Sequence, residues 1–204
     1  MSTIDVKTRT KNPTDIPVDP DPGGVAVTPD GKTAFVDSRF SGTVSTIDVK
    51  TRTKNPTDIP VGSFPQGLSF TPDGNTAFVG KRLGDTVSTI DVKTRTKNPT
   101  DIPVGPGPLP HAITPDGKTV FVPNFRSDTV STIDVKTRTK NATDIPVGTY
   151  PNGVAVTPDG KTAFVTNVLS DTVSTIDVKT RAKNPTDITV GTQPGSVTIT
   201  PCRR

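Results

Sequence analysis

His111 is the only histidine in the chain, and histidine is the side chain that most readily exchanges a proton near neutral pH. The residues 43 positions before and after it are Leu68 and Val154, so histidine replaces an aliphatic residue of a repeated pattern. A histidine at this place could act as a general base or as a metal ligand. A neutral, hydrogen-bonded side chain in a crowded interior is the alternative, and we favour it.

Other residues that could do chemistry are sparse. Asp21, Asp37 and Asn124 are the nearest plausible oxygen donors if His111 held a metal, and the sequence does not determine whether they converge. The chain contains no GxxxxGK[ST] phosphate loop, no GxGxxG, no HExxH, no CxxC and no GxSxG motif. We therefore predict neither a metal nor a cofactor.

The elements that position these residues belong to an internal repeat. The segment STIDVKTRTKNPTDIPV occurs unchanged at 2–18, 45–61 and 88–104, and returns slightly altered at 131–147 and 174–190, always 43 residues apart. A fixed period of this length is typical of a fold built from one stacked supersecondary unit. Because the period leaves no room for a linker, we predict a single domain over residues 1–204.

Each repeat is predicted to form four short strands. All twenty acidic residues are Asp, and the chain is rich in Val, Thr, Ile, Pro and Gly, which favours strands and turns over helices. In one repeat the expected strands are 154–157, 162–165, 172–178 and a fourth around 187–190, with Pro158-Asp159-Gly160 as a tight turn between the first two. Four strands in 43 residues match one blade of a β-propeller.

The ends of the sequence suggest how the propeller closes. Residues 2–18 correspond to the third and fourth strands of a repeat, and residues 196–200 correspond to a first strand. We expect an all-β propeller of about five four-stranded blades, closed by N- and C-terminal strands that share one incomplete blade. That blade lacks its second strand.

The repeat resembles the bacterial YVTN-type β-propeller family. The resemblance rests on PNGVAVTPDGKTAFVTN at 151–167 followed by TVSTIDV at 172–178, and it extends over essentially the whole chain. Phenylalanine stands in the place of the tyrosine of the motif, at Phe35, Phe78, Phe121 and Phe164. The resemblance implies a propeller fold, which in this family often has a larger ring.

Differences between the repeats concentrate in two sets of loops. The loop before each first strand carries a different residue in every copy, followed by an unchanged proline; these are Asp21, Phe64, Gly107, Tyr150 and Gln193. The loop after each second strand also varies, at 37–40, 80–83, 123–126 and 166–169. Because the strands of a blade alternate in direction, both sets should emerge on one side of the propeller. Loops on a rigid scaffold often carry binding residues. The candidate binding residues are Asp21, Asp37, Arg39, Phe40, Phe64, Arg82, His111, Asn124, Phe125, Arg126, Tyr150, Asn167 and Gln193.

The opposite side of the propeller should be monotonous and basic. Lys50, Arg52 and Lys54 recur in the turn between the third and fourth strands of each copy. We favour a solvated surface, partly neutralised by the aspartates that recur at 15, 58, 101, 144 and 187, with at most weak polyanion binding. Two further sets of aspartates are interpreted as scaffold: Asp30, Asp73, Asp116 and Asp159 in turns, and Asp5, Asp48, Asp91, Asp134 and Asp177 in strands.

Two functions fit this sequence. The favoured one is a non-enzymatic scaffold that binds a small molecule or a protein on the variable loops. The alternative is a small propeller enzyme, such as a lactonase-like hydrolase or an acid–base catalyst, that uses His111.

Cellular location and assembly are expectations of the same kind. The sequence has no apolar run long enough for a membrane span and no signal segment, so a cytoplasmic location is expected, or an extracytoplasmic one if the chain is a processed form. Near-identical repeats favour homo-oligomers formed by exchange of strands or blades. Cys202, the only cysteine, is expected in a frayed tail.

Overall fold

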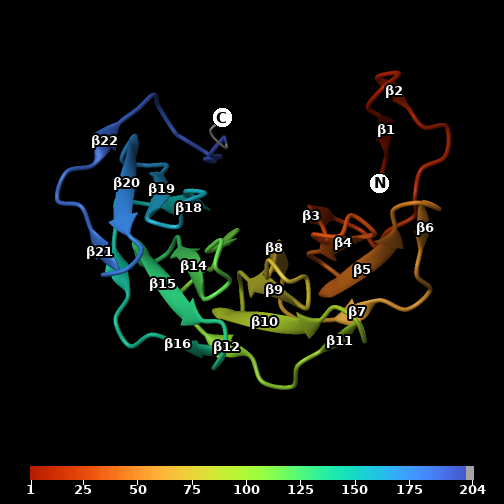
Figure 1. The fold of residues 1–204 in the computed structure, drawn as a ribbon, viewed down its shortest axis with the longest axis horizontal. Coiled ribbons are helices and arrows are strands. Elements are labelled where there is room, and N and C mark those ends of the chain that lie inside the picture. The colour runs from red at the N-terminus through yellow and green to blue at the C-terminus, as the bar shows by residue number, and fades with distance from the viewer. Residues whose placement is uncertain (201–204) are drawn as a thin grey trace.

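The computed structural model describes residues 1–200, and Cys202 lies outside them. Every regular element in this range is a β-strand, and the strands form sheets arranged as blades along an open arc (Figure 1). The all-β propeller architecture expected from the repeat is therefore confirmed. None of the described residues forms a helix that could cross a membrane.

Four blades are complete. The first contains β3 (Pro22–Val27), β4 (Thr33–Ser38), β5 (Thr43–Asp48), β6 (Thr53–Lys54) and β7 (Ile59–Pro60). The second contains β8 (Pro65–Phe70), β9 (Thr76–Lys81), β10 (Thr86–Asp91), β11 (Thr96–Lys97) and β12 (Ile102–Pro103). The third contains β13 (Ala112–Ile113), β14 (Thr119–Asn124), β15 (Thr129–Asp134), β16 (Thr139–Lys140) and β17 (Ile145–Pro146). The fourth contains β18 (Pro151–Val156), β19 (Thr162–Asn167), β20 (Thr172–Asp177), β21 (Ala182–Lys183) and β22 (Ile188–Thr189).

Within each blade the strands pair antiparallel in chain order, from the inner to the outer edge of the arc. The expected fourth strand is split into two short pieces, which both pair with the third strand. In three blades a proline without an amide proton stands at the split, but Ala142 stands there in the third blade, so proline does not account for every copy. The four-stranded blade predicted from the sequence is correct apart from this interruption.

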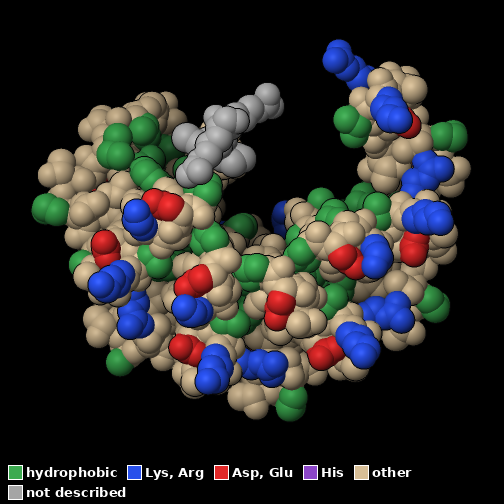
Figure 2. All heavy atoms as spheres, viewed as in Figure 1, with side chains coloured by type: hydrophobic (Ala, Val, Ile, Leu, Met, Phe, Trp, Pro, Cys, Tyr) green, Lys and Arg blue, Asp and Glu red, His purple; other side chains and the backbone are tan. Residues whose placement is uncertain are grey.

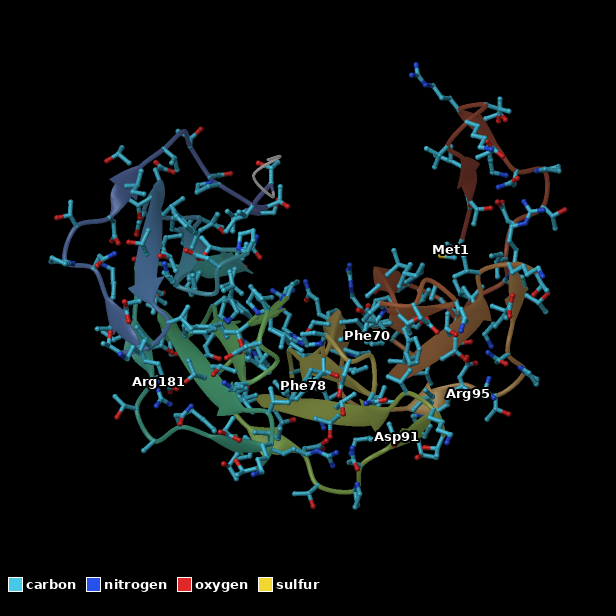
Figure 3. The ribbon with its side chains drawn as sticks, viewed as in Figure 1. Met1, Phe70, Phe78, Asp91, Arg95 and Arg181 are labelled. Atoms are coloured by element: carbon cyan, nitrogen blue, oxygen red, sulfur yellow. The ribbon has the colours of Figure 1, made fainter. Side chains whose placement is uncertain are left out.

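The apolar core is distributed between neighbouring blades. Phe35, Phe78 and Phe121 come from the second strand of successive blades, and each is fully buried. Phe78 packs with Val87 and Ile102 of its own blade and with residues of the next blade, namely Val120, Val122 and Ile133. Figure 3 places Phe78 inside the arc, whereas Arg95 and Arg181 lie along its outer edge. The blades are thus held together by repeated interfaces instead of one central core.

The expected closure of the ring is not formed. The strands β1 (Ile4–Asp5) and β2 (Thr10–Lys11) pair only with each other within residues 1–200, and residues 191–200 contain no strand. The segment around Ser196 instead lies against the fourth blade, where the Asn152 side chain donates to the Gly195 carbonyl at 2.7 Å. A first strand and a third strand have no ladder in common, because both pair with the second strand. The prediction of a shared blade is therefore wrong for the described residues, and the two ends of the arc stay apart (Figure 1).

The repeated aspartates are scaffold, as predicted. Asp48, at the end of β5, accepts hydrogen bonds from the backbone amide and the hydroxyl of Thr51, and its counterparts Asp91, Asp134 and Asp177 do the same in the other three complete blades. These bonds lower the pKa of Asp48. Asp30 accepts hydrogen bonds from the Thr28 hydroxyl and the Lys32 amide in the turn between β3 and β4.

The basic side of the arc is partly neutralised. Five lysines form ion pairs with the aspartate four residues further along, at 2.7–2.9 Å; the pairs are Lys11–Asp15, Lys54–Asp58, Lys97–Asp101, Lys140–Asp144 and Lys183–Asp187. Figure 2 shows basic and acidic side chains alternating along the arc. This surface therefore carries interspersed charges of both signs and no continuous basic field.

Candidate functional site

The two variable loop sets lie side by side in space. Backbone amides of the loops that follow the second strands donate to carbonyls of the loops that precede the first strands, at 3.0–3.2 Å; the pairs are Arg39 to Asp21, Arg82 to Phe64, Phe125 to Gly107 and Val168 to Tyr150. We call the surface formed by residues 19–21, 39–42, 61–64, 82–85, 104–107, 125–128, 147–150, 168–171 and 190–195 the variable loop face. The prediction that both sets emerge on one side is confirmed.

A repeated hydrogen bond explains why one position of these loops can vary. The residue before the constant proline has a positive φ in all five copies: 56° at Asp21, 54° at Phe64, 70° at Gly107, 59° at Tyr150 and 52° at Gln193. In three copies its amide donates to a carboxylate of the neighbouring loop at 2.8–2.9 Å; the acceptors are Asp85, Asp128 and Asp171. The backbone is thereby fixed, and the side chain is free to differ.

Four side chains from three loops form an arginine–aromatic cluster, which consists of Arg82, Phe125, Arg126 and Tyr150. The Arg82 guanidinium lies 4.6 Å from the centroid of the Phe125 ring and the Arg126 guanidinium lies 5.2 Å from it. The Tyr150 ring is tilted by 54° against Phe125, with 4.9 Å between centroids. Neither guanidinium forms an ion pair with any residue in the described part of the chain. Two positive charges are therefore stacked on an aromatic surface and available to an external anion.

Exposed apolar side chains also lie on the variable loop face. Phe40 is 78% exposed and meets Phe64 edge to face, with 6.0 Å between ring centroids. Leu83 and Leu169 occupy the position of Phe40 in the second and fourth blades, and they are 56% and 62% exposed. The sequence comparison did not single out these two leucines, although their 43-residue spacing from Phe40 was the available signal.

Asp37 and Arg39 begin the variable loop of the first blade but differ in solvent exposure. Asp37 is fully buried and accepts hydrogen bonds from the amides of Gly24, at 2.8 Å, and Gly67, at 3.0 Å. Burial raises the pKa of Asp37, while these amides oppose the shift. Since Gly67 belongs to the next blade, Asp37 links two blades. Arg39 forms a long ion pair of 3.8 Å with Asp21, in which both side chains are about one third exposed.

His111 is buried between two blades. Its side chain is 8% exposed, and Nε2 donates to the Phe78 carbonyl of the preceding blade at 3.2 Å. Gly80, which stands where Asp37 does in the first blade, leaves the space that the ring occupies. Burial lowers the pKa of His111 to about 4, although the carbonyls of Phe78 and Leu109 favour the protonated ring. The histidine is therefore neutral at physiological pH.

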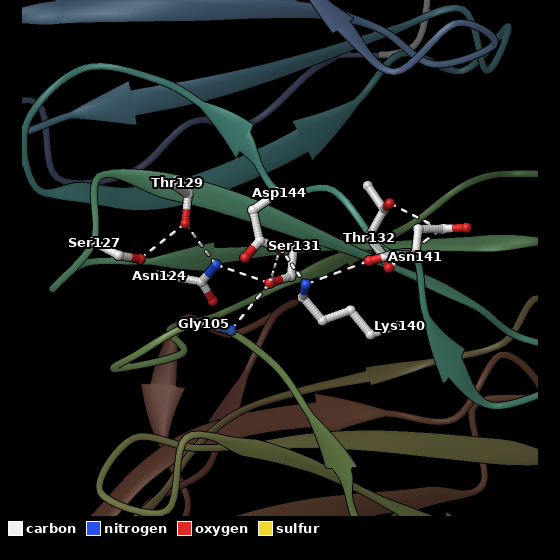
Figure 4. Close-up of polar contacts among 9 residues, drawn as sticks. All are labelled: Gly105, Asn124, Ser127, Thr129, Ser131, Thr132, Lys140, Asn141 and Asp144. Carbon is white, nitrogen blue, oxygen red and sulfur yellow. Dashed lines mark hydrogen bonds and ion pairs between the residues drawn. The ribbon is translucent and has the colours of Figure 1, made fainter.

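Asn124 and Asn167 are also fully buried, at equivalent positions in the third and fourth blades. The Asn124 amide lies 3.0 Å from the Thr129 hydroxyl and 2.9 Å from the Ser131 hydroxyl. Ser131 in turn donates to Asp144 at 2.8 Å, and Asp144 is paired with Lys140 (Figure 4). The amide of Gly105, in the segment that leaves the second blade, donates to the same Ser131 hydroxyl at 3.1 Å, so the network links two blades, and its Lys140–Asp144 end is about one quarter exposed.

The candidate residues thus separate into two groups. Asp37, His111, Asn124 and Asn167 lie inside or between blades, whereas the loop residues Arg39, Phe40, Arg82, Arg126 and Gln193 are half-buried or exposed. Within residues 1–200, no three histidine, cysteine or acidic side chains are grouped so that they could hold a metal ion. The accessible residues of the variable loop face can contact a partner through aromatic rings, leucine side chains and guanidinium groups.

Comparisons with known proteins agree with the fold. A family model described as YNCE-like beta-propeller matches residues 119–194. No curated protein sequence matches the chain at a significant level.

Solved structures give a wider match. Hydrazine synthase of Kuenenia stuttgartiensis is 27% identical with a TM-score of 0.78, over 87% of this chain and 52% of that one. A protein of unknown function from Desulfotomaculum acetoxidans is 18% identical with a TM-score of 0.80, over 90% and 61%. A putative 6-phosphogluconolactonase from Bacteroides fragilis is 21% identical with a TM-score of 0.74, over 86% and 56%. The chain spans between about half and three fifths of the length of these relatives, and it shares their β-propeller architecture.

Proposed function

We propose that this protein is a non-enzymatic interaction scaffold whose variable loop face binds a protein partner that carries carboxylate groups. The observation that carries the proposal is the arginine–aromatic cluster, in which Arg82 and Arg126 stack on Phe125 and have no ion-pair partner among the described residues. Arginine and aromatic residues are the types most often found at the energetic centres of protein interfaces.

The surroundings of the cluster support a protein partner. Phe40, Leu83 and Leu169 are exposed apolar side chains at the same position of three blades. Since they are spread along the arc, one extended surface could contact several of them at once. A planar guanidinium held by stacking loses less side-chain freedom when it forms a bidentate bond with a carboxylate.

The alternative of an enzyme that uses His111 gains no support from the geometry. The ring is buried and hydrogen-bonded to a backbone carbonyl, and its pKa of about 4 leaves it a weak base. A general base acts best when its pKa lies near the working pH and its nitrogen reaches the substrate.

Binding of fluorescein-labelled poly-L-glutamate, followed by fluorescence anisotropy at low salt, tests the proposal. The double variant Arg82→Gln/Arg126→Gln should bind at least roughly tenfold more weakly than the wild type, because two charge-assisted contacts are lost. The matched control is Arg95→Gln/Arg138→Gln, which removes two arginines from the repeated turns on the other side. The proposal fails if the control loses as much affinity as the cluster variant.

A further inference from the structure

An apolar pocket of about 260 Å³ lies between the N-terminal segment and the first complete blade. Its apolar lining from the blade consists of Val25, Val27, Ala34, Ile47 and Val49, with Arg52 beside them, and its lining from the N-terminal segment includes Met1 and Ile16. Val25, Val27 and Val49 are 60%, 50% and 41% exposed. The engineered cavity known to bind benzene measures roughly 150 Å³, so this pocket has room for a phenyl ring.

The same site is filled at the next interface along the arc. Phe35 is fully buried there, and it belongs to one cluster with Leu68, Phe70, Ala77, Ile90 and Val92 of the second blade. Each of these residues lies 43 positions after a residue that lines the pocket: Val25, Val27, Ala34, Ile47 and Val49. Phe35 meets the Phe70 ring edge to face at 5.1 Å. The pocket therefore corresponds to the site that a phenylalanine side chain fills at each of the complete interfaces.

The residues on the N-terminal side of the pocket also match residues of the filled interface at a spacing of 43. Met1 and Ile16 stand 43 residues before Val44 and Ile59, which flank Phe35 in its cluster. What the described residues do not supply here is a second strand, since β1 pairs only with β2. The other edge of β1 thus has backbone groups available for a further strand, and Ile4 of β1 is 67% exposed.

We propose that this pocket and the neighbouring edge of β1 bind an extended segment with the pattern of this protein's second strands, Thr-(Ala or Val)-Phe-Val. The segment adds to β1 as an antiparallel strand and places its phenyl ring in the pocket. The pairing of β4 with β5 gives the register, because Phe35 lies opposite Thr46 and Val36 opposite Ser45. When this register is moved back by 43 residues, the phenylalanine of the incoming segment lies opposite Thr3, and the valine that follows it lies opposite Ser2.

Continuity with the established interfaces is the reason for this choice of occupant. Three interfaces of the arc are built around a phenylalanine from a second strand, namely Phe35, Phe78 and Phe121. The pocket presents apolar side chains at the equivalent positions in the same order, with the smaller Val25 and Val27 in place of Leu68 and Phe70. An unrelated apolar ligand would fill the space but would leave the edge of β1 unpaired.

A labelled peptide with the sequence of residues 32–38, Lys-Thr-Ala-Phe-Val-Asp-Ser, tests the inference by fluorescence anisotropy. The wild-type chain should bind it saturably, and a peptide with alanine in place of phenylalanine should bind roughly ten- to hundredfold more weakly. The peptide should also raise the unfolding temperature, by an amount that grows with the logarithm of its concentration above the Kd. Equal affinity for the two peptides would overturn the proposal, and this comparison does not depend on any variant of the chain.

A pair of variants locates the binding. Val27→Lys places a charge in the pocket and should weaken binding of the phenylalanine peptide to a similar extent. Val190→Lys introduces the same charge at an exposed valine that follows β22 in the fourth blade, outside both the pocket lining and the edge of β1, so it should bind as the wild type does. The proposal is refuted if both variants lose affinity equally. A dimer that excludes the peptide in sedimentation experiments would assign the pocket to a second copy of the chain and would also refute it.

Discussion

Replacement of a second-strand phenylalanine should have very different effects at two places in the arc. Phe78 is fully buried between the second and third blades. Phe164 holds the equivalent position in the fourth blade, where residues 1–200 supply no complete further blade to cover it, and it is only half-buried. The same substitution by alanine therefore compares a closed interface with an open one.

The expected magnitudes follow from burial. Phe78→Ala removes a ring that packs with residues of both blades and leaves a cavity, which typically lowers the free energy of unfolding by about 3–5 kcal/mol. Phe164→Ala leaves no enclosed cavity, and only part of the transfer free energy of the ring is lost, so we expect about 1–2 kcal/mol. The difference between the two variants should be about 2–3 kcal/mol.

Urea unfolding followed by circular dichroism measures both values. The slope with denaturant must be compared as well, because a chain of stacked repeats can lose an end blade before the rest unfolds. Equal losses for Phe78→Ala and Phe164→Ala would mean that Phe164 is covered in solution. That result would refute the open arc.

Three further predictions concern single side chains. His111→Leu should remove a pH dependence of stability, because the folded pKa of about 4 lies below the usual 6.5. The contribution of His111 is present above pH 6.5 and is lost as the pH falls towards 4, so thermal unfolding at pH 7 and pH 4.5 should differ by roughly 2 kcal/mol in the wild type only. Asp91→Asn should destabilise the chain at pH 7 and have progressively less effect below pH 3.8, because hydrogen bonds from Thr94 lower the pKa of Asp91; a loss independent of pH would contradict this. Arg95→Gly should stabilise the chain by roughly 0.5–1 kcal/mol, because Arg95 has a φ of 57°, which glycine adopts without strain; a lower unfolding midpoint in urea would contradict it.

Much of the fold follows from the sequence because the repeat makes each blade a copy of the others. The alternation of Val, Phe and Ile with turn residues predicted the strands of the fourth blade to within a few residues, and the Pro-Asp-Gly turns lie where expected. The split of the outer strand was not predicted, and Pro56 and its counterparts do not explain it alone, because the third blade is split at Ala142. The ring closure was predicted wrongly, because counting strands does not show that a first and a third strand lack a common partner.

The sequence predicted where the candidate residues lie on the blades, but not which of their side chains are exposed to solvent. Variation between copies identified Arg82, Phe125, Arg126 and Tyr150, which the structure brings into one cluster. The same criterion also selected Asp37, which is buried because its carboxylate accepts amides from two blades. Side-chain direction at the end of a strand decides between these cases, and it depends on neighbouring blades that a single repeat does not contain.

Hydrogen–deuterium exchange of the chain with and without poly-L-glutamate tests the central claim, that the variable loop face is the binding surface. We predict that the polymer slows amide exchange in the loops at 82–85 and 125–128, which carry Arg82, Phe125 and Arg126, and leaves the repeated turns at 50–54 and 93–97 unchanged. Protection confined to those repeated turns, with no change in the loops, would contradict the claim.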